Sequence, residues 1–302
     1  MSWFYLALLA PFLYAVVNLI DDNLIRAIDK GPGLIAMIAG LFGALPLISL
    51  LFLDVHGIPG KFAIMSVIAG FLTITYYYFY FKALEVEQPS VVVALFSLVP
   101  ATLPFLAFFF LGERLTALQI LGFIVVLGAS FTLAVTDIKK FKFSDAIWFI
   151  VVAAALLDIT SLLSKYVYQN VDFYSAYMFF SAGMGLGGIA MLIISRSNSE
   201  GLAALKSLKS HLKKILPFIV IGELFNLSAE FTLNLAVSKG PVSLVRVIEG
   251  IQPIFVLLIA LALFPFAPRY FREAGEGHLK KKFIGMVVIV IGLGLISMAS
   301  SS

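Results

Sequence analysis

The sequence predicts an all-α polytopic membrane protein with ten transmembrane helices in two inverted five-helix repeats. Apolar residues make up 61% of the 302 residues and charged residues only 13%, against roughly 25% charged residues in a typical soluble protein. The apolar residues form ten segments, each close to the roughly 20 residues that a bilayer core requires. Polar and proline positions of the first half recur in the second half. This composition excludes a soluble globule, a disordered chain and, since cysteine is absent, a disulfide scaffold.

Charged residues, glycines and prolines separate the ten expected helices. Strands of a membrane barrel would alternate polar and apolar residues, and these segments do not alternate. They therefore indicate helices at residues 3–25, 32–53, 62–82, 89–111, 115–136, 146–168, 173–195, 216–237, 241–263 and 282–299.

Two connecting loops are longer than the others. In the loop at 196–214, leucines recur at helical spacing from Leu202 to Leu212, with lysines between them. This pattern predicts an amphipathic helix that lies on a membrane surface. The loop at 265–282 is irregular and basic.

The two halves of the chain share polar and proline positions. A shift of 143 residues places Asp29 over Asp172, and Pro100 of the fourth segment corresponds to Pro253 of the ninth. Because five helices is an odd number, the second repeat would enter the membrane from the opposite side, as in many secondary transporters. The predicted repeats are residues 1–140 and 141–302.

The stretch from Ala83 to Thr132 carries a series of motifs. They are Ala83-Leu84, Ser97-Leu98-Val99-Pro100, Leu111-Gly112-Glu113-Arg114, Gln119, Gly122 and Gly128. In order and spacing this series resembles the EamA-type family of the drug/metabolite transporter (DMT) superfamily. The resemblance implies a ten-helix exporter or exchanger of small metabolites, with a cavity between helices 1–4 and 6–9 and with helices 5 and 10 at the periphery. The second half departs from the pattern, because residues 264–282 replace the compact Leu-Gly-Glu turn.

Glu113 of that turn is interpreted as structural. A carboxylate near the start of the fifth helix would complement the positive end of the helix dipole. We therefore leave Glu113 out of the expected substrate site.

The basic residues predict the orientation in the membrane. Of the 21 Lys and Arg residues, 16 follow odd-numbered segments and 4 follow even-numbered ones. The positive-inside rule then places the odd-numbered loops in the cytoplasm and both termini outside it. Basic residues at segment ends are typical of lipid contact, so the net charge of +4 does not indicate nucleic-acid binding.

The eighth segment places polar groups at membrane depth, where an ionisable side chain costs roughly 3 kcal/mol. Four side chains at spacings of 3, 4 and 4 fall on one stripe of the helix. They are Glu223, Asn226, Glu230 and Asn234. The stripe is either a polar seam between helices or the wall of a water-accessible cavity, and we favour the cavity.

The ninth segment carries Arg246 and Glu249 as neighbours at i,i+3, followed by Gln252. A rise of about 1.5 Å per residue puts Glu230 and Arg246 at nearly the same depth, so the two could pair across the helices. Such a pair would either be structural or line the cavity.

Other segments supply further candidate substrate-binding residues. Asp158 lies near the middle of the sixth segment, and Asn18 lies near the end of the first. Tyr77 and Tyr80, in a tyrosine-rich third segment, could stack on a planar substrate.

The favoured function is secondary transport by alternating access. The substrate would be a small polar metabolite, with an amino acid, a related zwitterion or an amine favoured, and protons are the candidate coupling ion. An enzyme is not expected, because the histidines are scattered in loops and no catalytic motif is present. No cofactor, metal or nucleic-acid partner is expected. The alternatives are a non-transporting scaffold or lipid-handling protein, or an exchanger of sugar- or nucleotide-type metabolites. The expected location is the plasma (inner) membrane.

Overall fold

The computed structural model describes residues 2–27, 31–52, 57–86, 92, 98–134, 146–263 and 279–300. Within these residues the secondary structure is helical and contains no strand. This confirms the predicted all-α class. The basic loop expected at 265–282 falls almost wholly outside the described residues.

The helices follow the expected segments closely. In the first half they are α1 (Trp3–Ala27), α2 (Pro32–Gly43), the 3-10 helix η1 (Leu45–Leu51), α3 (Gly60–Val86), α5 (Leu98–Leu111) and α6 (Ala117–Ala134). In the second half they are α7 (Ala146–Asn170), α8 (Phe173–Ser197), α9 (Ser199–Lys239), α10 (Val242–Glu249), α11 (Gln252–Leu263) and α12 (Leu279–Ser300).

Within the described residues, six helical stretches are long and apolar enough to cross a membrane. They are Trp3–Ile20, Pro32–Leu51, Gly60–Val86, Ile147–Asn170, Phe173–Ser197 and Ile215–Lys239. Shorter apolar helices lie at Ala101–Leu111, Ala117–Ala129 and Val287–Ile296. The chain is therefore a polytopic membrane protein, while the number of ten spans stays a prediction.

Two of the expected helices are interrupted. The second segment changes from α2 to η1 at Ala44, next to Pro46, which lacks a backbone donor. The ninth segment divides into α10 and α11 at Gly250–Ile251, where both amides bond to carbonyls three residues earlier.

The amphipathic helix and the eighth span form one continuous helix rather than two. Helix α9 begins at Ser199, where the Asn198 carboxamide accepts from the Gly201 amide at 2.7 Å, and it runs 41 residues to Lys239. Leu205 and Leu208 pack against a buried cluster beneath them. The apolar face of this segment therefore contacts the protein itself at these positions.

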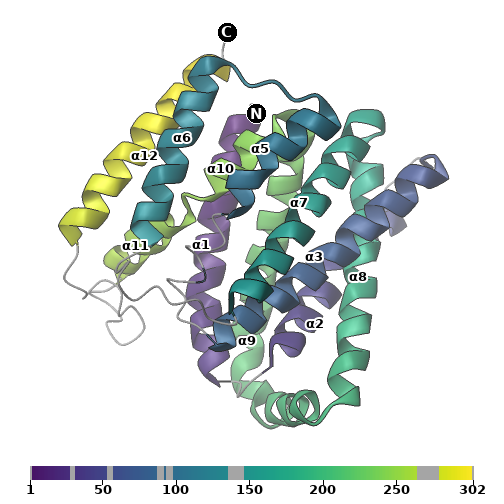
Figure 1. Ribbon diagram of the computed structural model, residues 1–302. Coiled ribbons are helices and arrows are strands. Elements are labelled where there is room, and N and C mark those ends of the chain that lie inside the picture. The colour runs from purple at the N-terminus through teal and green to yellow at the C-terminus, as the bar shows by residue number, and fades with distance from the viewer. Residues whose placement is uncertain are drawn as a thin grey trace.

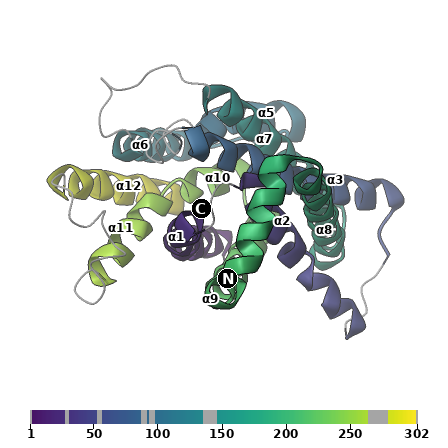
Figure 2. The same cartoon turned by 90° about the horizontal axis from the view of Figure 1, so that it is seen from below.

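Helices of the first half pack mainly on helices of the second half (Figure 1). The main pairs are α1 with α9, α3 with α7 and α8, α2 with α8, and α6 with α12. The α6–α12 pair lies at one edge of the molecule in both views (Figures 1 and 2). Helix α10 contacts α1, α5, α6, α7 and α9.

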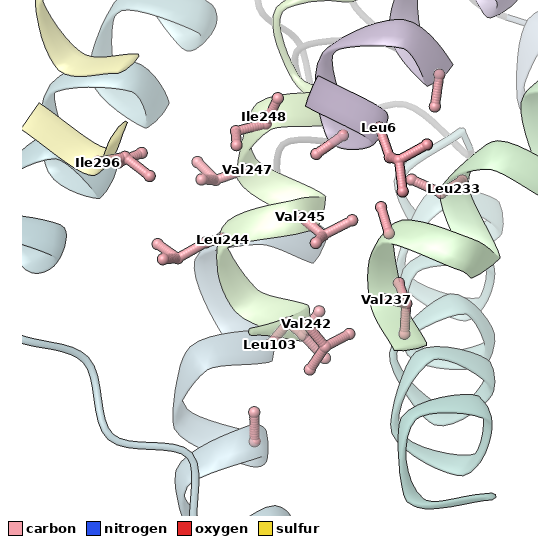
Figure 3. Close-up of a cluster of buried hydrophobic side chains, with 14 of the residues drawn as sticks. Leu6, Leu103, Leu233, Val237, Val242, Leu244, Val245, Val247, Ile248 and Ile296 are labelled. Carbon is pink, nitrogen blue, oxygen red and sulfur yellow. The ribbon is translucent and has the colours of Figure 1, made fainter. Parts of the chain in front are cut away.

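Helix α10 is the centre of the largest apolar cluster (Figure 3). All seven residues from Val242 to Ile248 are buried, which leaves no face of this helix for solvent or lipid. In Figure 3, Leu244 and Val247 point toward Ile296 of α12, whereas Val245 points toward α1 and α9. Arg246 of α10 is therefore held inside the bundle.

Glycines allow the closest helix contacts. A Cβ on Gly183 of α8 would lie 2.1 Å from the Val67 carbonyl oxygen of α3, and one on Gly70 would lie 1.9 Å from the Phe180 carbonyl oxygen. The glycine-rich part of α8 thus permits the close packing expected of small residues between membrane helices.

Candidate functional site

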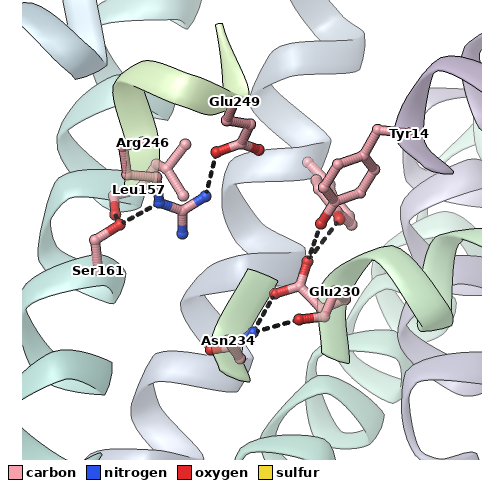
Figure 4. A network of polar contacts seen from close by, with 8 residues as sticks. Tyr14, Leu157, Ser161, Glu230, Asn234, Arg246 and Glu249 are labelled. Atoms are coloured by element: carbon pink, nitrogen blue, oxygen red, sulfur yellow. Dashed lines mark hydrogen bonds and ion pairs between the residues drawn. The ribbon is translucent and has the colours of Figure 1, made fainter. Parts of the chain in front are cut away.

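Glu230 of α9 lies at the centre of a buried polar cluster (Figure 4). Its side chain is 4% exposed. The Tyr14 hydroxyl of α1 donates to Oε2 at 2.6 Å, and the Tyr77 hydroxyl of α3 donates to the same oxygen at 3.4 Å. The Asn234 amide donates to Oε1 at 2.9 Å. Three helices therefore meet on one carboxylate.

Asn234 connects this carboxylate to α7. Its amide nitrogen also donates to the Glu230 backbone carbonyl at 3.0 Å, while its side-chain oxygen accepts from the Tyr168 hydroxyl at 2.9 Å. The two residues lie one turn apart on α9, as the predicted polar stripe requires.

Arg246 of α10 is paired with Glu249 and not with Glu230. Its Nη1 lies 2.7 Å from Oε2 of Glu249, and its Nε donates to the Ser161 hydroxyl of α7 at 3.0 Å. Ser161 in turn donates to the Leu157 carbonyl at 2.7 Å. No described residue accepts a hydrogen bond from Nη2 of Arg246. Equal depth suggested the Glu230–Arg246 pair, but α10 directs Arg246 toward α7, whereas Glu230 faces α1 and α3.

Glu249 lies at the break in the ninth segment. It is the last residue of α10, and Gln252 is the first residue of α11. Both side chains are partly exposed, and that of Glu249 is 21% exposed. Interrupted helices of this kind place polar groups near the midplane of many transporters.

Asp158 of α7 lies against α5. The Thr102 hydroxyl donates to Oδ2 at 2.6 Å, and the residue is 4% exposed. Its Oδ1 has no hydrogen-bond partner among the described residues. Asp158 is three residues before Ser161 on the same helix face, so it borders the Arg246 group.

Three candidates lie away from the buried centre. Asn18 of α1 is exposed, while Glu223 and Asn226 of α9 are half-buried. Asn226 donates to Oε2 of Glu223 at 3.1 Å. Contact between Ile20 and Gly222 places these parts of α1 and α9 at one level. Relative to the buried centre, Asn18 lies toward the end of α1, and Glu223 and Asn226 lie toward the start of α9.

Tyr80 takes a position different from that of Tyr77. It is half-buried and packs on the small cluster formed by Ala83, Val92 and Ile150. Tyr77 thus reaches the carboxylate at the centre, and Tyr80 packs about one turn further along α3.

Four members of this buried polar cluster were not predicted from the sequence. They are Tyr14, Thr102, Ser161 and Tyr168. A helix-face argument could have found three of them. Ser161 follows Asp158 at i+3, Tyr168 follows Ser161 at i+7, and Tyr14 precedes Asn18 by one turn, so each continues a helix face that carries a candidate.

The first part of the chain is similar to a known transporter family. The model of the EamA-like transporter family matches residues 1–135. This part of the chain, somewhat less than half of it, is therefore similar to the EamA-like transporter family. The family is part of the drug/metabolite transporter superfamily, so the resemblance of the Ala83–Thr132 motifs is confirmed.

A likeness of fold to a solved structure covers nearly the whole chain. A solved structure titled "Crystal structure of protein" superposes with a TM-score of 0.68 at 20% sequence identity. The match covers 98% of this chain and 96% of that one. At this identity the match shows a shared fold. Among curated proteins, no match to this chain was found.

The Leu-Gly-Glu turn of the EamA-like segment caps a different helix from the one expected. Glu113 accepts hydrogen bonds from the amides of Val242 at 2.8 Å and Ser243 at 3.2 Å, so it caps α10. The fifth predicted helix, α6, has its own reciprocal cap between Thr116 and Gln119. The capping role was predicted correctly, but the helix was wrong, because spacing along the chain favours the nearest helix start.

Proposed function

We propose that this EamA-like protein is a secondary transporter that carries a small amine or zwitterion, such as an amino acid, by alternating access. The similarity to this family supports membrane transport of the DMT type. The buried polar cluster between α1, α3, α7, α9 and α10 supplies the binding groups.

The environment of Glu230 is the observation that carries this proposal. All three side chains that donate to its carboxylate are neutral, two phenols and one amide. A buried carboxylate is strongly unfavourable unless a positive charge or a proton compensates it. An ammonium group and a proton both meet this need, and only one of them can occupy the carboxylate at a time. Their competition would couple substrate movement to proton movement in the opposite direction.

The balance of charges in the cluster favours the same substrate class. Asp158, Glu230 and Glu249 bring three carboxylates, against the single guanidinium of Arg246. Arg246 keeps Nη2 available for a substrate carboxylate, which makes a zwitterion a good match. A phosphorylated substrate would meet more negative charge than positive charge, so sugar-phosphate and nucleotide substrates fit less well.

Uptake into proteoliposomes tests the proposal. The purified protein would be screened against amino acids, amines and sugars, with and without a pH gradient. Glu230→Gln should reduce gradient-driven uptake at least about tenfold, because one charge-assisted interaction contributes roughly 1.5–3 kcal/mol. Glu200→Gln is the matched control, since Glu200 is exposed in the first turn of the same helix. Glu230→Gln protein with normal uptake and an unchanged response to the gradient would refute the role of Glu230. A scaffold would transport none of the substrates.

A further inference from the structure

The turn between α9 and α10 is held from two sides by opposite charges. The Lys165 ammonium group of α7 donates to the carbonyls of Val237 at 2.9 Å and Gly240 at 2.8 Å. The Glu113 carboxylate accepts from the first two amides of α10, as described above.

Each charge complements the helix end that it contacts. The last carbonyls of α9 form the negative end of its dipole, and the first amides of α10 form the positive end of another. Lys165 is only 8% exposed. Removing its carbonyl partners would leave a buried ammonium group unpaired, which is strongly unfavourable. The turn therefore stays in place as long as both side chains hold it.

The two side chains come from distant parts of the chain. Lys165 belongs to α7, and Glu113 belongs to the turn between α5 and α6. The Trp3 ring of α1 also covers the turn so closely that a Cβ on Gly240 would lie 2.4 Å from it. The starts of α1 and α10, the ends of α7 and α9, and the α5–α6 turn thus converge at one end of the bundle.

The opposite end of the same helices is more open. On α1, Ala7 and Pro11 are buried, Tyr14 is half-buried, and Asn18, one turn further on this face, is exposed. On α9 the same change occurs, because Asn234 and Glu230 are buried whereas Glu223 and Asn226 are half-buried. On these faces of α1 and α9, exposure therefore increases away from the α9–α10 turn.

We propose that Glu113 and Lys165 form a latch that closes the α9–α10 end of the transport pathway, in a conformation whose other end is open. Passage toward the closed end requires both side chains to release the turn. The latch also fixes the register of Glu230 on α9 and Arg246 on α10, since the turn joins these two helices. This inference rests on the alternating access proposed above.

The absence of cysteine allows a direct test of access, because a single introduced thiol has no background. Ser164→Cys reports on the latched end, since Ser164 is 4% exposed and adjoins Lys165. Asn18→Cys reports on the other end. A membrane-impermeant maleimide would be applied to the α9–α10 side of proteoliposomes for the first reporter and to the opposite side for the second.

Glu113→Ala and Lys165→Ala should each raise labelling of the Ser164→Cys protein roughly tenfold and slow labelling of the Asn18→Cys protein. Arg114→Ala is the matched control, since Arg114 is the exposed neighbour of Glu113, and it should change neither rate. Lys165→Arg, which keeps the charge, should restore slow labelling of Ser164→Cys.

Milder variants cover the case in which an alanine variant does not fold. Glu113→Gln keeps one acceptor oxygen but loses the charge, so it should give intermediate labelling rates. Folded latch variants that label like the parent at both reporters would overturn the proposal. Labelling requires no substrate, so this result is separate from the identity of the transported molecule and from the outcome of the uptake assay.

Discussion

The strength of the contacts on Glu230 should differ between its two tyrosines. Tyr14 donates at 2.6 Å and Tyr77 at 3.4 Å, toward the long limit for a hydrogen bond. Tyr14→Phe removes the shorter bond while keeping the ring, so we expect a loss of about 1–2 kcal/mol in unfolding free energy or substrate binding. Tyr77→Phe should cost clearly less.

Thermal unfolding in detergent and uptake rates measure these two effects. Tyr77→Phe is the matched control, because it also removes a phenol hydroxyl that donates to Oε2 of Glu230. Equal losses in the two variants would show that the 2.6 Å contact has no special role.

At the residue scale, the sequence predicted several of the buried polar side chains, but not their partners. Helical spacing put Glu230 and Asn234 on one stripe, and both are buried and hydrogen-bonded to each other. The rise per residue predicted nearly the same depth for Glu230 and Arg246. It could not give the direction in which Arg246 points, because that depends on how α10 is rotated against α7. The contacts of Tyr14 and Tyr168 likewise depend on helix rotation.

At the element scale, glycine contacts determine how closely α8 approaches α3. Gly183→Ala would bring a Cβ to 2.1 Å from the Val67 backbone carbonyl, which cannot move without shifting α3. We expect a loss of roughly 1–3 kcal/mol in unfolding free energy, as for other overpacked cores. Thermal unfolding in detergent measures it.

Gly294→Ala is the control for this prediction. A Cβ at Gly294 meets no described atom within 4 Å. Alanine also favours helix over glycine by about 1 kcal/mol, so this variant should be as stable as the parent or more stable. A Gly183→Ala protein that unfolds at the parent temperature would show that the close approach is not needed.

The helices themselves were largely predictable from apolar length, whereas their interruptions were not. The ninth segment was expected as one helix, but it breaks at Gly250–Ile251, just before the helix resumes at Gln252. Polar residues at 196–214 suggested a separate surface helix. The structure joins it to the following span in α9, because Pro217 does not interrupt that helix. Local patterns mark where a helix can form, and packing decides where it stops.

At the scale of the whole molecule, two of the main helix pairs are counterparts of each other when the two halves of the chain are exchanged. Under the proposed repeat, α1 corresponds to α7 and α9 to α3, so the α1–α9 and α3–α7 pairs exchange with each other. Two inverted repeats would give this arrangement, and the repeat itself stays a prediction. The sequence supplied the correspondence through Asp29 and Asp172, while only tertiary packing reveals which helices meet.

The orientation of the molecule connects the charge pattern to the latch. The start of α1 and the end of α12 lie at the same end as the α9–α10 turn (Figure 1). The exposed lysines of α9, such as Lys206 and Lys209, lie near the start of that helix, at the opposite end of the molecule (Figure 1). If the positive-inside rule holds for this chain, the latch faces outward and the open end faces the cytoplasm.

Two single-cysteine variants test this orientation in whole cells. Ser2→Cys should react with an impermeant maleimide from outside, whereas Lys209→Cys should react only after permeabilisation. Each serves as the control for the other, because both positions lie on the described surface at opposite ends. The reverse pattern would contradict the prediction from charge. It would leave the latch contacts unchanged but turn the same conformation into one open to the outside, so that Glu113 and Lys165 would guard the cytoplasmic end.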